Sequence, residues 1–194
     1  MGQPKPAKIP FEDYLAIERR DDVRYAYIDG EIYSMAGGTV KHSTICFNTS
    51  GVLRDISRKA GTCQGFNSEM KIEVKPRGKY FYPDAGLACP KFIESTHLTG
   101  AIVNPKLIVE VTSKESAGYD MGAKFRSYWS IPTVHEYVLV EQDQPVVTIY
   151  RRRNDLMKVD FYEGVNAVAP LESVAGELRL SEIYENVTFE EQSK

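Results

Sequence analysis

The segment at residues 107–111 constrains the fold of this chain more than any other, because it combines strong apolar character with one acid. It consists of Leu107, Ile108, Val109, Glu110 and Val111. Continuous apolar runs of this kind are typical of strands buried on both faces in the centre of a sheet. A carboxylate there is costly unless it is paired or binds a metal. The alternative is an edge strand on which Glu110 and Ile108 share a solvent-facing side.

A second acid, Asp84, follows Pro83 near the start of the apolar segment 80–89. Two acids on adjacent strands can share one hard cation through oxygen ligands, as Mg²⁺ requires. Such an ion can polarise a phosphoryl oxygen and lower the pKa of bound water. Asp84 alone is equally compatible with a simple turn aspartate, so neither acid is diagnostic singly.

The segment 119–130 is predicted to be a helix that ends before Pro132, since the residue preceding a proline resists the helical region. Asp120, Lys124 and Tyr128 recur at i, i+4 and i+8 and therefore line one stripe. Lys124 either serves the acids or is a solvated lysine paired with Asp120. The neighbouring stripe is expected to pack on the sheet; it consists of Met121, Phe125 and Trp129.

Hydrophobic periodicity and turn signals predict α/β or α+β architecture, with a mixed central β-sheet flanked by helices. The expected elements are a helix at 11–18, a hairpin at 25–36, a helix at 41–59 capped by Gly61, strands at 63–74 and 80–89 paired as one long hairpin, an exposed loop at 90–104, strands at 107–111, 135–140, 145–150 and 157–162, and a closing helix at 181–184. Strand 107–111, helix 119–130 and strand 135–140 should form a βαβ unit with parallel strands. Residues 1–10 are expected to be a flexible leader, and residues 11–194 a single domain.

Composition narrows the class of protein. The chain is 42% hydrophobic and 26% charged, which is ordinary for a soluble globular protein. It has no run of roughly 18 apolar residues and no signal-peptide core at its start. We therefore expect a cytoplasmic protein with no membrane association. The net charge of −3 argues against a large nonspecific phosphate-binding surface but leaves room for a local basic groove.

Three cysteines, Cys46, Cys63 and Cys89, are widely spaced and form no CxxC pair. That spacing argues against a structural zinc site. We interpret each cysteine as a small buried hydrophobe in a reducing compartment.

Several short motifs together resemble a known family. They lie at residues 28–32, 82–84, 107–113, 119–128, 131–140 and 180–184, with His42 opening the second helix. In this combination the chain resembles the Uma2 family of restriction endonuclease-like proteins, within the PD-(D/E)XK nuclease superfamily. The resemblance runs from Phe11 to Phe189 and implies a restriction-endonuclease-like core.

The resemblance implies a Mg²⁺-dependent endonuclease, with Mn²⁺ as a substitute, that hydrolyses phosphodiester bonds of DNA. Asp84, Glu110 and the backbone carbonyl of Val111 would be the metal ligands. The superfamily's usual motif has a lysine two residues after the second acid, where this chain has Thr112. The resemblance then points to Lys124 on the following helix as the third catalytic residue.

Other residues enter as auxiliary candidates. Ala26 stands where similar sequences often carry a glutamate, which leaves Glu31 as a possible contact from that hairpin. His42 either assists at the site or caps and packs its helix. Asp120 and Tyr128 share the stripe of the candidate lysine.

Basic residues on or near the hairpin that leads to Asp84 could contact phosphates, or could be a solvated hairpin tip. They are Lys71, Lys75, Arg77 and Lys79. Residues 151–153, three arginines, are interpreted as a solvated turn. Two rival functions stay open: a catalytically inactive nuclease-fold protein that binds nucleic acid, and an interaction protein that oligomerises through exposed aromatics. A homo-oligomer, specifically a dimer, is expected.

Overall fold

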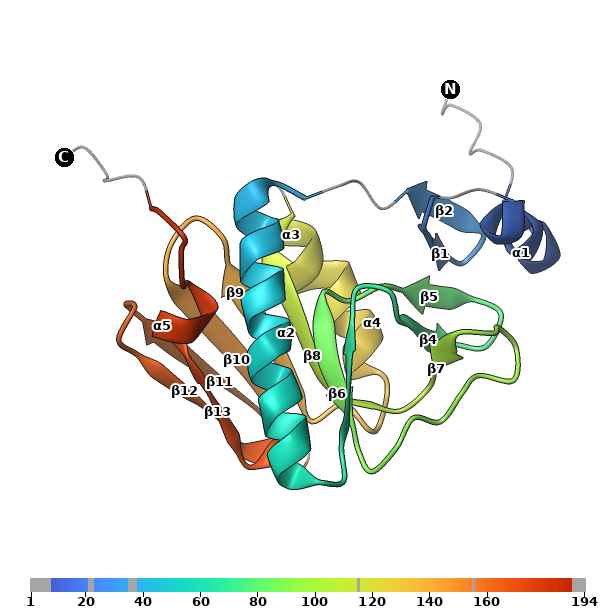
Figure 1. Ribbon diagram of the computed structural model, residues 1–194. Helices are drawn as coiled ribbons and strands as arrows, with labels where there is room; N and C mark the ends of the chain where they lie inside the picture. The colour runs from blue at the N-terminus through green and yellow to red at the C-terminus, as the bar shows by residue number, and fades with distance from the viewer. Residues whose placement is uncertain (1–7, 21–22, 35–37, 115, 155, 190–194) are drawn as a thin grey trace.

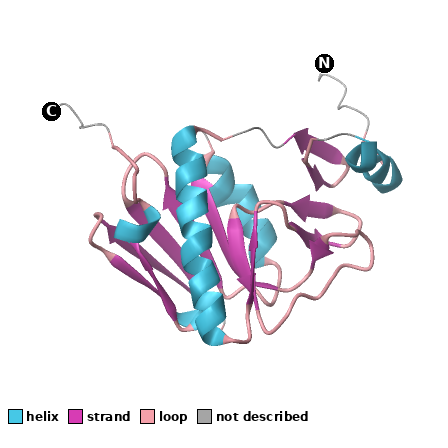
Figure 2. Ribbon diagram, viewed as in Figure 1, coloured by secondary structure: helices cyan, strands magenta, loops and turns pink. Residues whose placement is uncertain are grey.

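The computed structural model describes residues 8–20, 23–34, 38–114, 116–154 and 156–189 (Figure 1 and Figure 2). In chain order the elements are α1 (Phe11–Arg20), β1 (Tyr25–Ile28), β2 (Glu31–Ser34), α2 (Val40–Ala60), β3 (Gln64–Asn67), β4 (Lys71–Lys75), β5 (Lys79–Phe81), β6 (Ala85–Ala88), β7 (Ala101–Ile102), β8 (Pro105–Thr112), α3 (Ala117–Tyr119), the π-helical turn η1 (Asp120–Lys124), α4 (Phe125–Trp129), β9 (Glu136–Glu141), β10 (Val146–Arg153), β11 (Leu156–Glu163), β12 (Val168–Leu171), the 3₁₀ turn η2 (Glu172–Val174), β13 (Gly176–Arg179) and α5 (Leu180–Ile183).

Two sheets carry the fold. A six-stranded sheet has the order β11-β10-β9-β8-β6-β3, and a five-stranded sheet has the order β2-β1-β5-β4-β7. β8 is central in the larger sheet, antiparallel to β6 and parallel to β9. The mixed sheet and the parallel βαβ unit predicted from the sequence are therefore confirmed. β12 and β13 form a separate hairpin, which the sequence did not predict.

Helices cover both faces of the larger sheet, with α2 in front of it and α4 behind it in Figure 1. Leu107 and Val109 of β8 belong to the core on the α2 side, together with Ile45. Ile108 of the same strand belongs to the opposite core, together with Tyr128 of α4. β8 is thus buried on both faces, and the edge-strand alternative is wrong.

α2 begins and ends as the sequence predicts. The Thr39 hydroxyl accepts a hydrogen bond from the His42 N–H at 3.0 Å, which satisfies one of the free donors of the first turn. Gly61 ends the helix with φ 68°, a left-handed conformation that glycine adopts without a Cβ penalty. The Thr39 cap therefore fixes where the first turn of α2 lies, and Gly61 fixes where the helix ends.

The segments 63–74 and 80–89 do not form one long hairpin. Each is split: β3 and β6 pair in the larger sheet, whereas β4 and β5 pair in the smaller one. The chain turns after Asn67, whose carbonyl accepts from the Met70 N–H, and again around Pro83. Apolar alternation continues across both bends, so periodicity alone cannot reveal them. The second bend places Asp84 immediately before β6, where the chain passes from one sheet to the other.

The interpretation of all three cysteines as separate thiols is wrong for two of them. Gln64 of β3 lies opposite Ala88 of β6, so the same register brings Cys63 beside Cys89. Their Cα atoms are 4.3 Å apart and they form a disulfide. Cys46 is a free, half-buried cysteine on α2. Sequence spacing could not show the pairing, because it depends on strand register.

The arginine triplet is also not a turn. It ends β10, and the Arg151 side chain is only 2% exposed. Its Nε lies 3.0 Å from Glu136 Oε1, and its guanidinium also pairs with Asp160. Arg152 stacks 4.4 Å above the Trp129 ring. Charged side chains can be buried when each has a partner, and partners from other strands are invisible in the local sequence.

Ile9 belongs to the segment expected to be a leader, most of which lies outside the described residues. Its N–H donates to the Gly30 carbonyl at 2.8 Å, so Ile9 is held against the hairpin. Among the helices that the structure describes, none combines the length and apolar character needed to cross a lipid bilayer.

Candidate active site

The pairing of β6 with β8 brings the two acids together. Ala85 lies opposite Val109, so the next step of the antiparallel register sets Asp84 beside Glu110. Asp84 Oδ2 accepts a hydrogen bond from the Val111 N–H at 2.7 Å, which ties its side chain to β8. The Asp84 side chain is 18% exposed, whereas that of Glu110 is 3% exposed. Asp84 therefore remains partly accessible to solvent, whereas Glu110 is buried.

Lys124 reaches the acids from the helix that follows β8. Its Nζ lies 2.7 Å from Glu110 Oε2 and 3.8 Å from Asp120 Oδ1. The turn that carries it is π-helical, since the Phe125 N–H donates to the Asp120 carbonyl. Single π-turns inside helices are frequent at functional sites. Lys124 of η1 therefore lies within ion-pair distance of the buried acid, as the sequence predicts for the candidate lysine.

The sequence predicts that the apolar stripe of this helix packs on the sheet, but the stripe that contains Lys124 is the more deeply buried of the two. Asp120, Lys124 and Tyr128 are buried, while Met121 is 52% exposed. Phe125 and Trp129 are only partly buried against the core on this side. Hydropathy ranks Asp and Lys as surface residues. Their ion pairs in this fold offset the free-energy cost of burying the charges.

Burial and mutual charge move the two carboxyl pKa values in opposite directions. Burial raises the pKa of Glu110 to about 8, although the Lys124 ammonium pulls it down. Burial also acts to raise the pKa of Asp84, but the hydrogen bond from His42 and the charge of Lys124 outweigh it and lower that pKa. Environments that separate the pKa values of neighbouring acids are typical of functional sites.

The two basic groups respond to these acids. Burial alone would lower the pKa of Lys124, but the charges of Glu110, Asp120 and Asp84 raise it. The hydrogen bond to Asp84 raises the pKa of His42 against the opposing effect of burial, and a main-chain hydrogen bond at Val111 adds to the rise. Lys124 is therefore a retained positive charge rather than a neutral amine.

The buried acid predicts a pH dependence for the metal-free protein. Glu110 has a pKa of about 8 in the fold against 4.5 ordinarily, so between these values the native state holds a proton that the unfolded chain has released. The free energy of unfolding then falls as pH rises through this window. We expect a loss of about 1 kcal/mol or more between roughly pH 5 and pH 8, measured by urea denaturation with a chelator present.

The variant Glu110→Gln isolates this contribution. His42, whose pKa is raised, loses its stabilising effect in the same direction above its ordinary value of 6.5, and it is unchanged in the variant. The slope should therefore be shallower in Glu110→Gln than in the parent. Equal slopes would contradict the raised pKa of Glu110.

The donor set fits a divalent cation. Glu110 Oε1 is buried and, among the described residues, has no hydrogen-bond partner. A buried carboxylate oxygen without a donor costs free energy that a bound cation would offset. Asp84, Glu110 and the Val111 carbonyl would supply the oxygen ligands that Mg²⁺ prefers. The Tyr128 hydroxyl is also buried with no partner within hydrogen-bonding distance in the described part of the chain. Burial raises its pKa most, and both the charge of Glu110 and a longer side-chain interaction with that acid add to the rise.

The auxiliary candidates Glu31 and His42 lie in different parts of the structure, and only His42 lies near the acids. Glu31 is exposed on β2, the outer strand of the smaller sheet, where it accepts a hydrogen bond from the Tyr33 hydroxyl. His42 lies in the first turn of α2 with Nε2 3.5 Å from Asp84 Oδ2. The structure thus brings His42 to the acids, and it records no contact between them and Glu31 among the described residues.

The basic residues of the β4–β5 hairpin already have acidic neighbours. Lys71 pairs with Glu18, and Arg77 pairs with Glu12. Lys75 and Lys79 lie 3.7 and 3.4 Å from the carboxylate of Asp29. Lys71 is the least available of the four, because its side chain is only 15% exposed.

One residue of the site was missed from the sequence. Cys46 Sγ lies 3.5 Å from His42 Nδ1. Burial raises the pKa of the Cys46 thiol, and the charges of Asp84 and Glu110 add to the effect. The available signal was its i, i+4 spacing from His42, which places both side chains on one face of α2.

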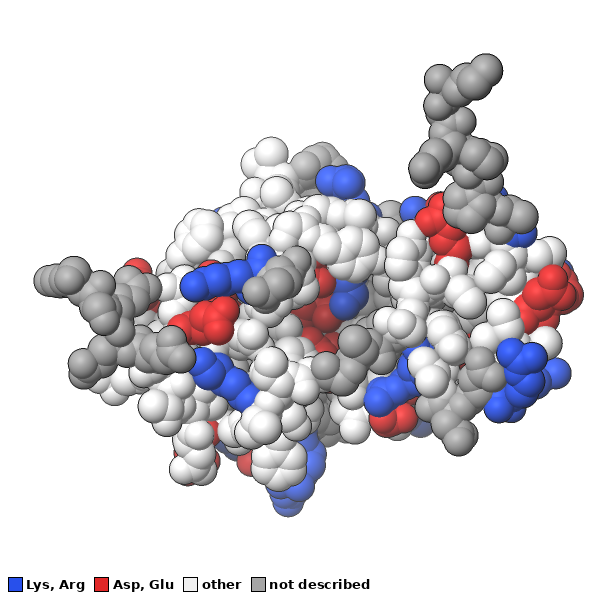
Figure 3. Space-filling view, turned by 90° about the horizontal axis from the view of Figure 1, so that it is seen from above, with Lys and Arg blue, Asp and Glu red and all other residues white. Residues whose placement is uncertain are grey.

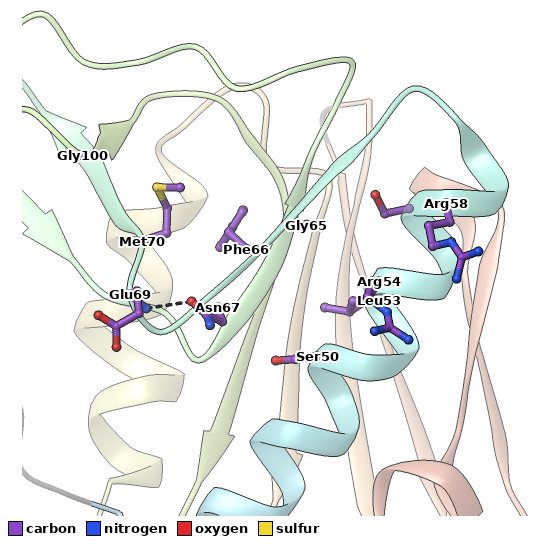
Figure 4. A pocket seen from close by; sticks show the side chains of 11 residues that line it. Ser50, Leu53, Arg54, Arg58, Gly65, Phe66, Asn67, Glu69, Met70 and Gly100 are labelled. Carbon is purple, nitrogen blue, oxygen red and sulfur yellow. Dashed lines mark hydrogen bonds between the residues drawn. The ribbon is translucent and has the colours of Figure 1, made fainter.

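The site opens at the end of the molecule where α2 begins. Seen from above, acidic and basic atoms are visible together in a recess near the middle of this face (Figure 3). A separate cavity of about 590 Å³ lies alongside α2 and β3 (Figure 4). Arg54 and Arg58 line it, but none of Asp84, Glu110 and Lys124 does. The cluster of Asp84, Glu110 and Lys124, rather than that cavity, is therefore the candidate active site.

The mixed sheet flanked by helices is a nuclease-like α+β fold. A solved structure with the same fold is described as a "putative nuclease belonging to DUF820" from Anabaena variabilis; it superposes with a TM-score of 0.74 at 15% identity and covers 93% of this chain and 99% of that one. The chain belongs to the Uma2 family, whose sequence model, described as "Putative restriction endonuclease", matches residues 11–182.

Two curated relatives come from Synechocystis sp., and both are described as uncharacterized proteins. The protein slr1290 is 34% identical over 149 residues, which is 76% of each chain. The protein sll1609 is 33% identical over 145 residues, which is 74% of this chain and 80% of that protein.

Proposed function

We propose that this protein is a metal-dependent endonuclease that hydrolyses phosphodiester bonds, with DNA as the substrate. The observation that carries the proposal is the convergence of Asp84, Glu110 and Lys124, in which a buried carboxylate oxygen of Glu110 has no hydrogen-bond partner among the described residues. Membership of a family described as restriction endonucleases supports the reaction class.

Asp84, Glu110 and the Val111 carbonyl would hold Mg²⁺, or Mn²⁺ in its place. When bound, the ion supplies positive charge at the phosphate and lowers the pKa of bound water. Lys124 keeps its proton because, against the effect of burial, the neighbouring acids Glu110, Asp120 and Asp84 raise its pKa. It therefore acts as a hydrogen-bond donor toward the developing negative charge, not as the general base. Asp120 Oδ1 lies 3.8 Å from Lys124 Nζ and adds a second acidic neighbour to the lysine.

A groove beside the site offers a path for the nucleic-acid backbone. It has a volume of about 370 Å³ and lies between the β4–β5 hairpin and the helix of Lys124. Lys75, Lys79 and Arg126 line it. Asp29, the acid that neighbours both lysines, lines it as well. None of the three candidate catalytic residues lines it; the groove adjoins their site through Tyr119 and Ala123 of the helical segment that carries Lys124. Cations of this kind contact phosphates and orient the strand without reading its sequence. Of the four basic residues proposed from the sequence, Lys75 and Lys79 are the two that line this groove.

The test is cleavage by purified protein of circular, linear and single-stranded DNA and of RNA, with Mg²⁺ or Mn²⁺. Asp84→Asn and Glu110→Gln should each lower the cleavage rate roughly 10³-fold, because losing about 4 kcal/mol of charge stabilisation has that effect. Glu31→Gln, an exposed acid on β2, is the matched control and should cleave like the parent.

Cleavage that survives Asp84→Asn would rule out this site. A parent protein that binds DNA but cleaves none of the substrates with either ion would favour the inactive binding protein instead.

Light scattering on the same preparations measures the mass of the particle in solution and tests the expected homodimer. The exposed apolar side chains of edge strand β11 are the surface we propose for it; they are Leu156, Met157 and Phe161.

A further inference from the structure

Three side chains with different metal-binding chemistry meet beside the acid pair. They are His42 and Cys46 of α2 and Asp84 before β6, and their ligand atoms all lie within 4.8 Å of one another. We propose that these three residues form a binding site for a zinc-class divalent cation, separate from the all-oxygen site of Asp84 and Glu110. Asp84 is common to both sites.

The donor types favour this class of ion. A thiolate and an imidazole are ligands for Zn²⁺ and its borderline-soft neighbours, whereas Mg²⁺ takes oxygen ligands. Three protein ligands, with the fourth position open, are the usual set of a zinc site that exchanges ligands with solvent. The His42 and Asp84 side chains are 25% and 18% exposed, so solvent could reach the open position.

The ligand atoms are spaced about as a tetrahedral centre needs, and rotation of the His42 side chain would aim one ring nitrogen at the shared ion without moving the backbone. Zinc bonds of about 2.0–2.1 Å to nitrogen and oxygen and 2.3 Å to sulfur, at tetrahedral angles, separate nitrogen from oxygen by about 3.4 Å and nitrogen from sulfur by about 3.6 Å. The observed separations are 3.5 Å from His42 Nε2 to Asp84 Oδ2 and 3.8 Å from the same nitrogen to Cys46 Sγ. His42 Nδ1 lies closer to Sγ, at 3.5 Å, so the imidazole would rotate on binding the ion.

Local structure holds two of the ligands in place. His42 and Cys46 are four residues apart on one helix, so both project from the same face. The Thr39 cap fixes the His42 main chain. A Cβ atom at Gly38 would lie 2.5 Å from His42 Nδ1, so the absence of a side chain there leaves room for the imidazole. Cys46 is available because it is outside the Cys63–Cys89 disulfide.

Because Asp84 belongs to both sites, an ion bound at one site affects the other. A zinc-class ion on His42 and Cys46 would draw the Asp84 carboxylate away from the Mg²⁺ position and would inhibit cleavage. This consequence rests on the proposed nuclease function, but binding of the ion does not. The decisive experiment therefore measures binding alone.

Cobalt is the probe, because a tetrahedral Co²⁺ complex has visible absorption and a Co²⁺–thiolate bond adds a charge-transfer band in the near ultraviolet. Chelator-stripped protein with its disulfide intact, in buffer without thiol reductant, is titrated with Co²⁺ and then with Zn²⁺. We expect both absorptions at one equivalent of Co²⁺ and their loss as Zn²⁺ displaces it. The matched control is His97→Gln, which removes a histidine paired with Glu73 and should leave the spectrum unchanged.

Cys46→Ala should abolish the charge-transfer band and weaken Zn²⁺ binding about 100-fold or more, since even a lost supporting contact costs about 10–100-fold. His42→Asn, at a side chain that is 25% exposed, should weaken binding similarly, and thermal melting of both variants checks that they fold. Glu110→Gln should retain the band, because Glu110 is not a ligand of this site. A parent spectrum without the thiolate band, or Zn²⁺ affinity unchanged in both Cys46→Ala and His42→Asn, would overturn the proposal, whether or not the protein cleaves DNA.

Discussion

Replacing Lys124 with methionine is expected to lower metal-dependent DNA cleavage by roughly 10²–10³-fold, the usual effect of removing one donor from a transition-state charge. The side chain of methionine has similar length but cannot donate to a phosphoryl oxygen. The carboxylates of Asp84 and Glu110 remain, so the variant should still bind Mg²⁺. Single-turnover cleavage rates and calorimetric Mg²⁺ titration, on the same preparation, separate the two properties.

The matched control is Lys158→Met, which removes a 55% exposed lysine on β11 and should cleave at the parental rate. Thermal melting of both variants establishes that they fold. A Lys124→Met protein that folds, binds Mg²⁺ and cleaves like the parent would show that the ammonium 2.7 Å from Glu110 takes no part in the reaction. Lys124 would then be a structural counter-charge for the buried acid.

Replacing Arg151 with methionine is expected to destabilise the fold by about 3–5 kcal/mol, because it leaves the buried Glu136 carboxylate without its counter-charge. The Glu136 side chain is 2% exposed and also accepts hydrogen bonds from the Glu172 and Ser173 N–H groups and from the Ser173 hydroxyl. For a chain of this size the loss corresponds to a fall of roughly 6–20 °C in the melting temperature.

Arg153→Met is the comparison, since Arg153 belongs to the same triplet but is 53% exposed and pairs with Glu172 at the surface. An exposed ion pair contributes about 0–1 kcal/mol, so this variant should melt close to the parent. Equal destabilisation by the two replacements, measured by urea denaturation, would show that the buried pair contributes no more than the surface pair.

Elements whose signals are local could be predicted from the sequence. The cap at Gly61 acts within a few residues and was predicted, and helix α2 lies where its periodicity placed it. Residues 107–111 are buried on both faces of the sheet, as expected for a continuous apolar run, which would expose apolar side chains to water on an edge strand. The same run made Glu110 the informative residue, since an acid inside it demands a partner.

Elements that depend on distant partners could not be predicted in this way. The alternation of residues 63–74 is the same whether they form one strand or two strands in different sheets, and a turn side chain such as Asn67 decides between these only in context. The positions of Cys63 and Cys89 follow from strand register. Arg151 looks like a surface residue until Glu136 and Asp160 are placed beside it.

The candidate site shows the same division. Sequence by itself determined that a central strand carries a buried acid, that a second acid begins a neighbouring segment, and that a lysine follows on a helix. Only the tertiary structure decided that Lys124, which lies in a π-turn, reaches Glu110, and that Cys46 joins His42 and Asp84. Sequence patterns report the burial and local conformation of each residue, whereas distances between side chains are set by register and by how whole elements pack.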